Sequence, residues 1–327
     1  MYIRPVKEDD IDALFAFLKQ STAELTSLPK DKGILTEKIA QSIASEKSHA
    51  LADWQRILMI LYDTGRHCIA GISGLEREKS FAPHYTIDQG KQCLRFETAA
   101  ISPIKLGSLL LRENYRNHGL GGLLSKSRFL YLANFTNPIA DYIHAELRGW
   151  VDTYGESPFW KIISSAFYGK TFSAVDQFRG SQPEIFAEYH LAAHDIPYHL
   201  VGQDVEKLIG KVHADTENAL RMLEKEGFSK TSSIDILDGG PILKSAISNI
   251  FTIKNSIFCP IMAAPVQDVL AEQWMISNSQ TIGFRAALRS AQYRGGYLFV
   301  HPQTLTTLEL ESGDLIRAIP KNPVNKR

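Results

Sequence analysis

The chain has 327 residues, enough for one large domain or two medium ones with an ample core. Lysine plus arginine number 36, as do aspartate plus glutamate, so the formal net charge is zero and gives no electrostatic footprint for nucleic acid or an anionic membrane surface. Cys68, Cys93 and Cys259 stand far apart without CxxC spacing, which predicts free thiols in a reducing compartment. No stretch has the pattern of a signal peptide or the length of a membrane span, so we expect a globular cytoplasmic protein with small-molecule partners.

The first part of the chain predicts an alternation of strands and helices. A strand over residues 3–6 leads through acidic residues into an amphipathic helix over 11–18, and a second helix is expected over 34–44. Two apolar runs within 57–72, joined by Asp-Thr-Gly, predict a β-hairpin. The pattern loosens over 76–105, where we expect part strand and part surface loop bordering a substrate site.

The most informative stretch begins with a short apolar strand. Its run of Leu109, Leu110 and Leu111 is typical of a covered central strand. A glycine-rich loop and the start of a helix follow, formed by Arg116, Asn117, His118, Gly119, Leu120, Gly121 and Gly122. Glycines remove side chains where the free N–H groups and the positive dipole of a helix N-terminus meet, which suits a pyrophosphate. Taken alone, the motif also fits an ordinary strand–helix turn without a ligand.

The remaining elements extend this α/β pattern. In chain order we expect a strand over 141–147, a helix from 157 with Phe159, Ile162, Ile163 and Phe167 on one face, helices over 184–193, 203–212 and 216–226, and a strand over 233–237. From about residue 241, strands rich in Ile and Val replace helical patterns, which predicts a β-rich appendage with a small barrel as one arrangement. We therefore expect two domains, 1–240 and 241–327.

The Arg-x-x-Gly-x-Gly spacing from Arg116 to Gly121 resembles the acyl-CoA signature of the GNAT superfamily, the acyl-CoA-dependent N-acetyltransferases. The string over 223–228 resembles the helix-to-strand corner that closes that fold. The resemblance implies a mixed, mostly antiparallel sheet flanked by helices. It also implies that the loop wraps the pyrophosphate of CoA and that the preceding strand splays from its neighbour to pair with the pantetheine arm.

Several longer strings resemble one narrower family, the arginine N-succinyltransferases of arginine catabolism. They lie at 25–29, 123–129, 145–149 with 157–160, 209–213 and 235–241. This resemblance implies transfer of the succinyl group of succinyl-CoA to the α-amino group of L-arginine, giving N2-succinylarginine and CoA. It implies succinyl-CoA as co-substrate and no metal.

Two functional positions carry over from this family onto matching strings. Leu109 corresponds to its succinyl-CoA contact, and His213 corresponds to its catalytic histidine, described as a proton donor. Imidazole suits either proton transfer that amide formation needs, because it titrates near neutral pH. His213 also stands just before a predicted helix, whose N-terminus disfavours a charged ring. The alternative is a packed or surface histidine, which the family string makes less favoured.

Other groups are expected around the reacting atoms. A backbone N–H of the strand over 109–111 is the candidate donor to the tetrahedral oxyanion. Glu146 and Arg148, at the end of a strand, are candidates for the substrate guanidinium and α-carboxylate, with Asp152 and Asp238 as further possibilities. Structural roles remain the alternative for all four.

Departures from the family leave further alternatives. Residues 81–105 look altered, and Lys105 stands where family members tend to carry an acidic residue, so ornithine or another amine is a possible substrate. A non-catalytic acyl-CoA-binding subunit is an alternative function, a scaffold with a docking tail is another, and a homo- or hetero-oligomer is possible. His190, His194 and His199 lie close in sequence, but without an HExxH glutamate a solvated helix end is the better interpretation.

Overall fold

The structure is a computed structural model that describes residues 1–21, 25, 27–28, 30–48, 54–77, 81–116, 118–135, 139–182, 185–186, 194–264 and 272–322. Its strands are β1 Tyr2–Pro5, β2 Arg56–Asp63, β3 Cys68–Arg77, β4 Phe81–Asp88, β5 Cys93–Ala99, β6 Ile104–Leu111, β7 Tyr142–Glu146, β8 Ile196–Pro197, β9 Ser229–Asp235, β10 Pro241–Ala246, β11 Ile257–Ala263, β12 Glu272–Asn278, β13 Ala286–Arg294, β14 Tyr297–Val300 and β15 Leu315–Pro320. Its helices are α1 Ile11–Gln20, α2 Lys32–Glu46, α3 Leu120–Leu132, α4 Ser165–Tyr168, α5 Phe172–Ser181, α7 Tyr198–Val201, α8 Gln203–Glu206, α9 Glu217–Lys225, α10 Phe251–Asn255 and α11 Pro302–Leu308.

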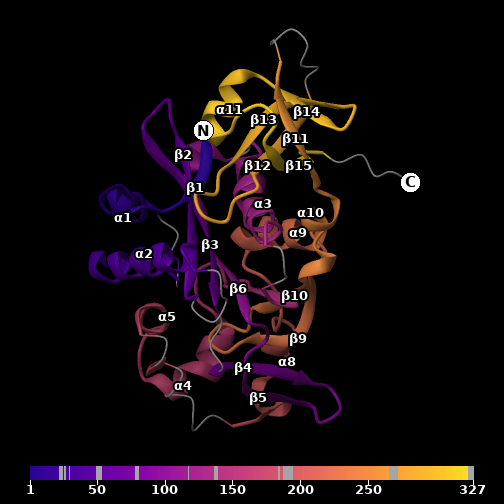
Figure 1. Ribbon diagram of the computed structural model, residues 1–327. Coiled ribbons are helices and arrows are strands. Elements are labelled where there is room, and N and C mark those ends of the chain that lie inside the picture. The colour runs from indigo at the N-terminus through magenta and orange to yellow at the C-terminus, as the bar shows by residue number, and fades with distance from the viewer. Residues whose placement is uncertain are drawn as a thin grey trace.

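One twisted sheet runs through the molecule, with helices on both faces (Figure 1). Its strand order is β12-β15-β11-β14-β13-β1-β2-β3-β6-β7-β10-β9-β4-β5-β8. Among the described strands the pairs β6–β7 and β11–β14 are parallel and the other pairs are antiparallel. The mixed, mostly antiparallel sheet flanked by helices confirms the fold class predicted from the sequence.

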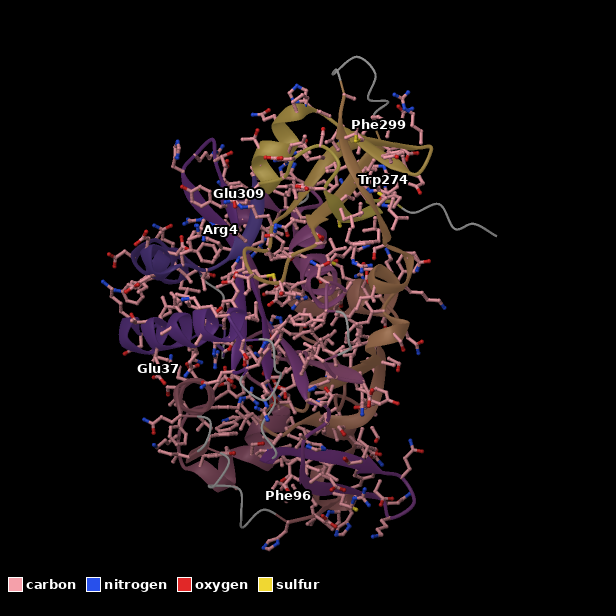
Figure 2. All side chains as sticks on the ribbon, in the orientation of Figure 1. Arg4, Glu37, Phe96, Trp274, Phe299 and Glu309 are labelled. Atoms are coloured by element: carbon pink, nitrogen blue, oxygen red, sulfur yellow. The ribbon has the colours of Figure 1, made fainter. Side chains whose placement is uncertain are left out.

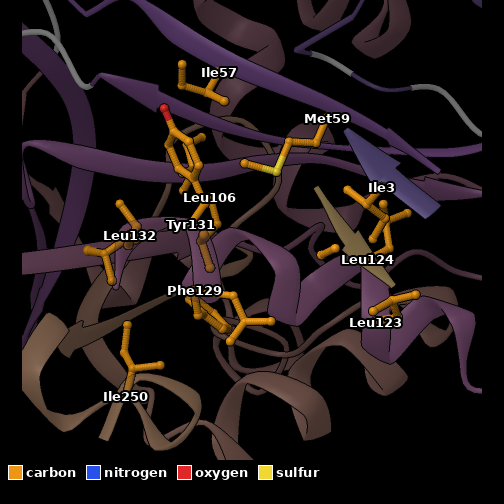
Figure 3. Close-up of a cluster of buried hydrophobic side chains, with 14 of the residues drawn as sticks. Ile3, Ile57, Met59, Leu106, Leu123, Leu124, Phe129, Tyr131, Leu132 and Ile250 are labelled. Atoms are coloured by element: carbon orange, nitrogen blue, oxygen red, sulfur yellow. The ribbon is translucent and has the colours of Figure 1, made fainter. Parts of the chain in front are cut away.

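The central strands are apolar on both faces because helices cover both. On one face, α1 and α2 pack Leu14, Phe17, Leu35 and Ile39 onto apolar residues of β2 and β3. On the other face, α3 supplies Phe129 and Tyr131, which Figure 3 shows among side chains of β2 and β6. The β2 residues 57, 59 and 61 belong to the α3 cluster and residues 58 and 60 to the α1–α2 cluster, as the period of a strand requires.

A third apolar cluster packs the segment after Ser157 and α5 against β4 and β9. The helices of this region differ in part from the sequence prediction. Ser157 caps the expected helix, since its Oγ accepts from the N–H of Trp160 at 3.2 Å, but the helix begins as a π-helical turn over Trp160–Ser164. Ile162 is therefore 51% exposed instead of facing the core. The prediction of a helix over 203–212 is also wrong, because only the short helix α8 forms there. The chain then turns at Gly210, whose N–H donates to the carbonyl of Gly239 at 2.8 Å. Most of the helix expected over 184–193 lies outside the described residues.

The C-terminal strands close a ring through the pairs β12–β15, β15–β11, β11–β14, β14–β13 and β13–β12, the arrangement of a small barrel. β10, which begins at Pro241, instead lies between β7 and β9 in the main sheet. If the chain is divided into two domains, we propose the boundary after α10. No helix among the described residues is long and apolar enough to cross a membrane.

Candidate active site

A bulge in β6 separates this strand from its neighbour at the middle of the sheet. Parallel pairing of β6 with β7 ends at Leu106, although β6 continues to Leu111. Opposite β3 the register shifts, and Ser108 has a positive φ of 58° that is uncommon for a side-chain-bearing residue. Gly107 and Ser108 consequently point to the same face: a Cβ at Gly107 would lie 3.2 Å from Glu76, and Ser108 Oγ lies 2.8 Å from Ser27 Oγ. The strands therefore part after Leu106.

Strand geometry directs the N–H groups of Leu109 and Leu111, two of the three predicted donors of β6, toward this opening. The N–H of Arg112 donates to the carbonyl of Ala70 on β3 at 2.9 Å. Successive N–H groups of a strand alternate in direction. The N–H of Leu110 therefore also points toward β3, whereas the N–H groups of Leu109 and Leu111 point toward the side of β7. Beyond its last pair with β6, the β7 chain turns toward β10, where the N–H of Leu147 donates to the carbonyl of Pro241 at 3.2 Å. Leu109 is thus placed with its N–H toward the gap.

The glycine loop leads into α3 as predicted. Gly119 is the N-cap, with a left-handed φ of 77°, and as a glycine it supplies no side-chain cap. The N–H groups of Leu120, Gly121 and Gly122 therefore lie at an uncapped N-terminus. A Cβ at Gly121 would meet no atom of the described residues within 4 Å beyond its chain neighbours and its own helix backbone, so these residues do not require glycine there. A glycine in the first turn of a helix, with open space above it, leaves the backbone N–H groups accessible to a close approach.

Cations surround this loop, including one that the sequence prediction missed. A Cβ at Gly119 would lie 2.8 Å from Nζ of Lys321, which follows β15. Arg116 is exposed, with Nη1 3.9 Å from a carboxylate oxygen of Glu113, and His118 is exposed beside it. Asn117 lies outside the described residues. Nothing in the local sequence connects Lys321 to a loop so much earlier in the chain, and only the closed C-terminal strands bring it there.

His213 is held on the extension of β7. Its N–H donates to the carbonyl of Arg148 at 2.8 Å, and Val212 forms a β-bridge with Gly149. Its ring caps the turn over Ala214–Thr216, because Nδ1 accepts from the N–H of Asp215 at 3.0 Å. A neutral ring with Nδ1 as acceptor carries its proton on Nε2. The side chain is 27% exposed, so Nε2 is a donor that solvent or a ligand reaches.

Two glycines allow the segments around His213 to cross. A Cβ at Gly149 would overlap the carbonyl oxygen of Asp238, and one at Gly240 would overlap the carbonyl oxygen of Leu147. Each contact is with backbone, which cannot move aside as a flexible side chain does. The family-like strings over 145–149 and 235–241 are therefore in direct backbone contact.

Glu146 ends β7 on the face that also carries Lys105. Its Oε2 lies 3.5 Å from Lys105 Nζ, and its Oε1 lies 3.8 Å from His144 Nε2. Burial alone would raise its pKa, but Lys105, His144 and Arg179 together hold the pKa of this carboxyl well below its usual range. Its side chain is 29% exposed. The site thus holds a partly exposed carboxylate whose lowered pKa favours the ionised form.

Arg148 lies in a network of buried carboxylates. Its Nη2 donates to Asp176 at 2.7 Å, and its Nη1 lies 3.7 Å from Asp238. Arg179 joins the network through Asp176 at 3.2 Å and Asp235 at 2.5 Å. Burial, followed by the charge of Asp235, raises the pKa of Asp238 to about 7. The sequence prediction named Arg148 and Asp238 but missed the α5 residues that join them.

Asp152 shapes an exposed turn by accepting from the N–H groups of Tyr154 and Glu156, each at 2.9 Å. It therefore has a structural role away from the network of Arg148. Over the ranges that the structure describes, no group of three or more His, Cys, Asp or Glu side chains is arranged to hold a metal ion.

Comparisons with known proteins identify a family and a shared fold. Residues 1–252 match the family described as arginine N-succinyltransferase beta subunit. Arginine N-succinyltransferases from Citrobacter koseri and from Escherichia coli are each 29% identical over 334 residues, which cover 98% of this chain and 97% of the relative. The solved arginine/ornithine succinyltransferase subunit AI from Pseudomonas aeruginosa has a TM-score of 0.85 at 22% identity, covering 98% of this chain and 99% of that one. This structure shows that the fold is shared.

Proposed function

The chain belongs to the arginine N-succinyltransferase family, and on this premise we propose that it transfers the succinyl group of succinyl-CoA to the α-amino group of L-arginine. It is an acyltransferase with the fold of the acyl-CoA-dependent N-acyltransferases. The observation that carries the proposal is the opening between β6 and β7, which lies between the glycine loop and His213. The matched family and the solved relative from Pseudomonas aeruginosa are both described as subunits, and we propose that this chain also acts in an oligomer.

Acyl-CoA binding is proposed along the gap between β6 and β7. The pyrophosphate would lie on the N–H groups of Leu120, Gly121 and Gly122, where the helix dipole favours an anion. Arg116 and Lys321 would supply charge beside it. The N–H of Leu109 would receive the thioester carbonyl and stabilise the oxyanion as it forms. The open space above Gly121 supports this placement.

His213 is proposed as the proton donor to the departing thiolate. The α-amino nitrogen attacks the thioester carbon and the C–S bond breaks. The thiolate takes the Nε2 proton of His213 in its imidazolium form, which leaves the ring neutral. Of the three ammonium protons, one stays on the amide nitrogen, one replaces the proton that His213 gives, and one leaves to solvent. Asp215 contacts His213 in a way that suits both protonation states of the ring. Its N–H donates to Nδ1 of the neutral ring, and its carboxylate, 3.8 Å from Nδ1, would stabilise the imidazolium.

The acceptor is proposed to lie against the end of β7. Glu146 would pair with the guanidinium, because it is ionised and accessible. Arg148 would bind the α-carboxylate, since 23% of its side chain remains exposed while Asp176 and Asp238 fix its orientation. Both groups belong to the same segment as the backbone that anchors His213. An arginine held between them would bring its α-amine toward His213.

Mass spectrometry of the products tests this function. The purified chain is incubated with succinyl-CoA and either arginine or ornithine, and each product is identified by its fragments. We expect N2-succinylarginine, formed at least tenfold faster than succinylornithine. Faster succinylation of ornithine would show that ornithine, and not arginine, is the preferred substrate. Binding of CoA without any acylated product would contradict the catalytic proposal.

A further inference from the structure

Lys38, in the middle of α2, has a buried ammonium group. The residue is 8% exposed, and its Nζ donates to the carbonyl of Ser27 at 2.7 Å and to the carbonyl of Gly180 on α5 at 2.9 Å. Two of its three N–H donors are thereby satisfied. Among the residues that the structure describes, no carboxylate forms an ion pair with Lys38. A buried charge without a counter-ion is costly and calls for an explanation.

Among the described residues, the carboxylates nearest Lys38 are paired with other groups. Arg56 pairs with Glu76 at 3.4 Å, and Lys105 pairs with Glu146 at 3.5 Å. Both pairs lie on the sheet face beneath α2. Glu37, the neighbour of Lys38 in sequence, lies at the outer edge of the molecule, where it accepts from Gln41 at 3.1 Å (Figure 2). The described carboxylates of this region are therefore engaged elsewhere.

Lys38 also lies close to the proposed acyl position. Its partner Ser27 bonds through Oγ to Ser108 Oγ at 2.8 Å, and Ser108 directly precedes Leu109 in the bulge of β6. The ammonium is thus separated by a single hydrogen-bonded residue from the strand that would hold the thioester carbonyl. The carboxylate of a succinyl group is three bonds beyond that carbonyl. It is the one negative charge whose position the thioester would fix on this side.

The acceptor arginine is a less suitable partner for the Lys38 ammonium. An arginine with a neutral α-amine carries a guanidinium and a carboxylate whose charges cancel, so it brings no excess negative charge. The proposed acceptor position also lies toward β7, where the backbone of His213 is bonded to Arg148. The succinyl carboxylate brings a negative charge on the side of β6 and α2.

We infer that Lys38 determines acyl-group specificity by binding the terminal carboxylate of succinyl-CoA. The inference rests on the proposed function, because it assumes that the thioester binds at Leu109. The carboxylate accepts from the third N–H of Lys38, while the carbonyls of Ser27 and Gly180 fix the other two. An uncharged acyl chain of the same length leaves the ammonium without a counter-ion and is disfavoured.

The electrostatics of Lys38 agree with such a role. Burial, followed by the charge of Arg56, lowers the pKa of Lys38 to about 8. Lys105 lowers this pKa further, whereas Glu76 and Glu37 raise it. A bound carboxylate favours the protonated ammonium, so ligand and proton bind together.

The experiment compares succinyl-CoA with butyryl-CoA, which has the same chain length without the carboxylate. Arginine-dependent kcat/KM is measured for both in wild type, in Lys38→Met and in the control Lys32→Met, an exposed position on the same helix. We expect Lys38→Met to lower kcat/KM for succinyl-CoA about a hundredfold and to change the value for butyryl-CoA less than threefold. Equal losses for both thioesters, or a rise confined to the KM of arginine, would overturn the inference.

A binding measurement on the wild type needs neither a folded variant nor turnover. We expect succinyl-CoA to bind at least tenfold more tightly than butyryl-CoA in the absence of arginine, and equal dissociation constants would overturn the inference. Selective binding without arginine turnover would contradict the proposed function and keep the carboxylate site. Turnover of both thioesters at equal rates would support the acyltransferase function and contradict a carboxylate-binding site at Lys38.

Discussion

Replacing Gly121 by alanine separates what the fold needs from what the ligand needs. Beyond its own helix, the added Cβ meets no atom of the described residues within 4 Å, and alanine is the better helix former by about 0.5–1 kcal/mol. The variant should therefore be as stable as the wild type or slightly more stable. If the pyrophosphate of acyl-CoA lies on this N–H group, the same methyl group occupies its place. We expect the dissociation constant of CoA to rise at least tenfold, equivalent to about 1.4 kcal/mol.

Calorimetric titration with CoA, together with thermal denaturation of the ligand-free chain, measures both quantities. Gly119→Ala is the matched control, because its φ of 77° predicts a loss of about 1–2 kcal/mol of stability. The two glycines of one loop should thus change stability in opposite directions. An unchanged affinity of Gly121→Ala for CoA would refute the placement of the pyrophosphate on this helix.

Three further predictions concern charge and packing. Lys321→Met should raise the dissociation constant of CoA three- to tenfold with no change in the KM of arginine, and loss of this effect at 1 M salt would support a charge contact. The pKa of Lys38, which burial lowers to about 8, means that the chain gains stability as pH rises from 8 to 10.5. Denaturant unfolding should therefore show wild type gaining about 3 kcal/mol over Lys38→Met in that window, and a constant difference would contradict it. Gly149→Ala should cost about 3 kcal/mol or more because its Cβ overlaps backbone, whereas Gly90→Ala in an exposed turn should not; equal melting temperatures would contradict this.

Local patterns predicted the central part of the molecule well. The apolar run of β6, the glycine loop and α3 each depend on neighbouring residues, so period and turn chemistry were sufficient to place them. The bulge at Ser108 has no such signal, because a register shift against β3 and a contact with Ser27 determine it. The sequence could indicate that a strand was present, but not where it would part from β7.

Long-range contacts explain the remaining differences. The expected helix over 203–212 stops early where Gly210 bonds to Gly239, a partner that no local window contains. The same holds for Lys321, which the closing of the C-terminal strands brings to Gly119, and for Lys38, whose sequence neighbours suggest an ordinary helix residue. Such residues become visible only when the tertiary structure shows what their side chains meet.

We propose that this chain succinylates arginine with His213 as proton donor. The release of CoA thiol from succinyl-CoA, with and without arginine, in wild type and in His213→Ala, tests this proposal. We predict release that depends on arginine in the wild type and falls at least a hundredfold in the variant, with CoA affinity unchanged. Equal rates in the two proteins would remove His213 from the chemistry, and release independent of arginine would contradict the transfer itself.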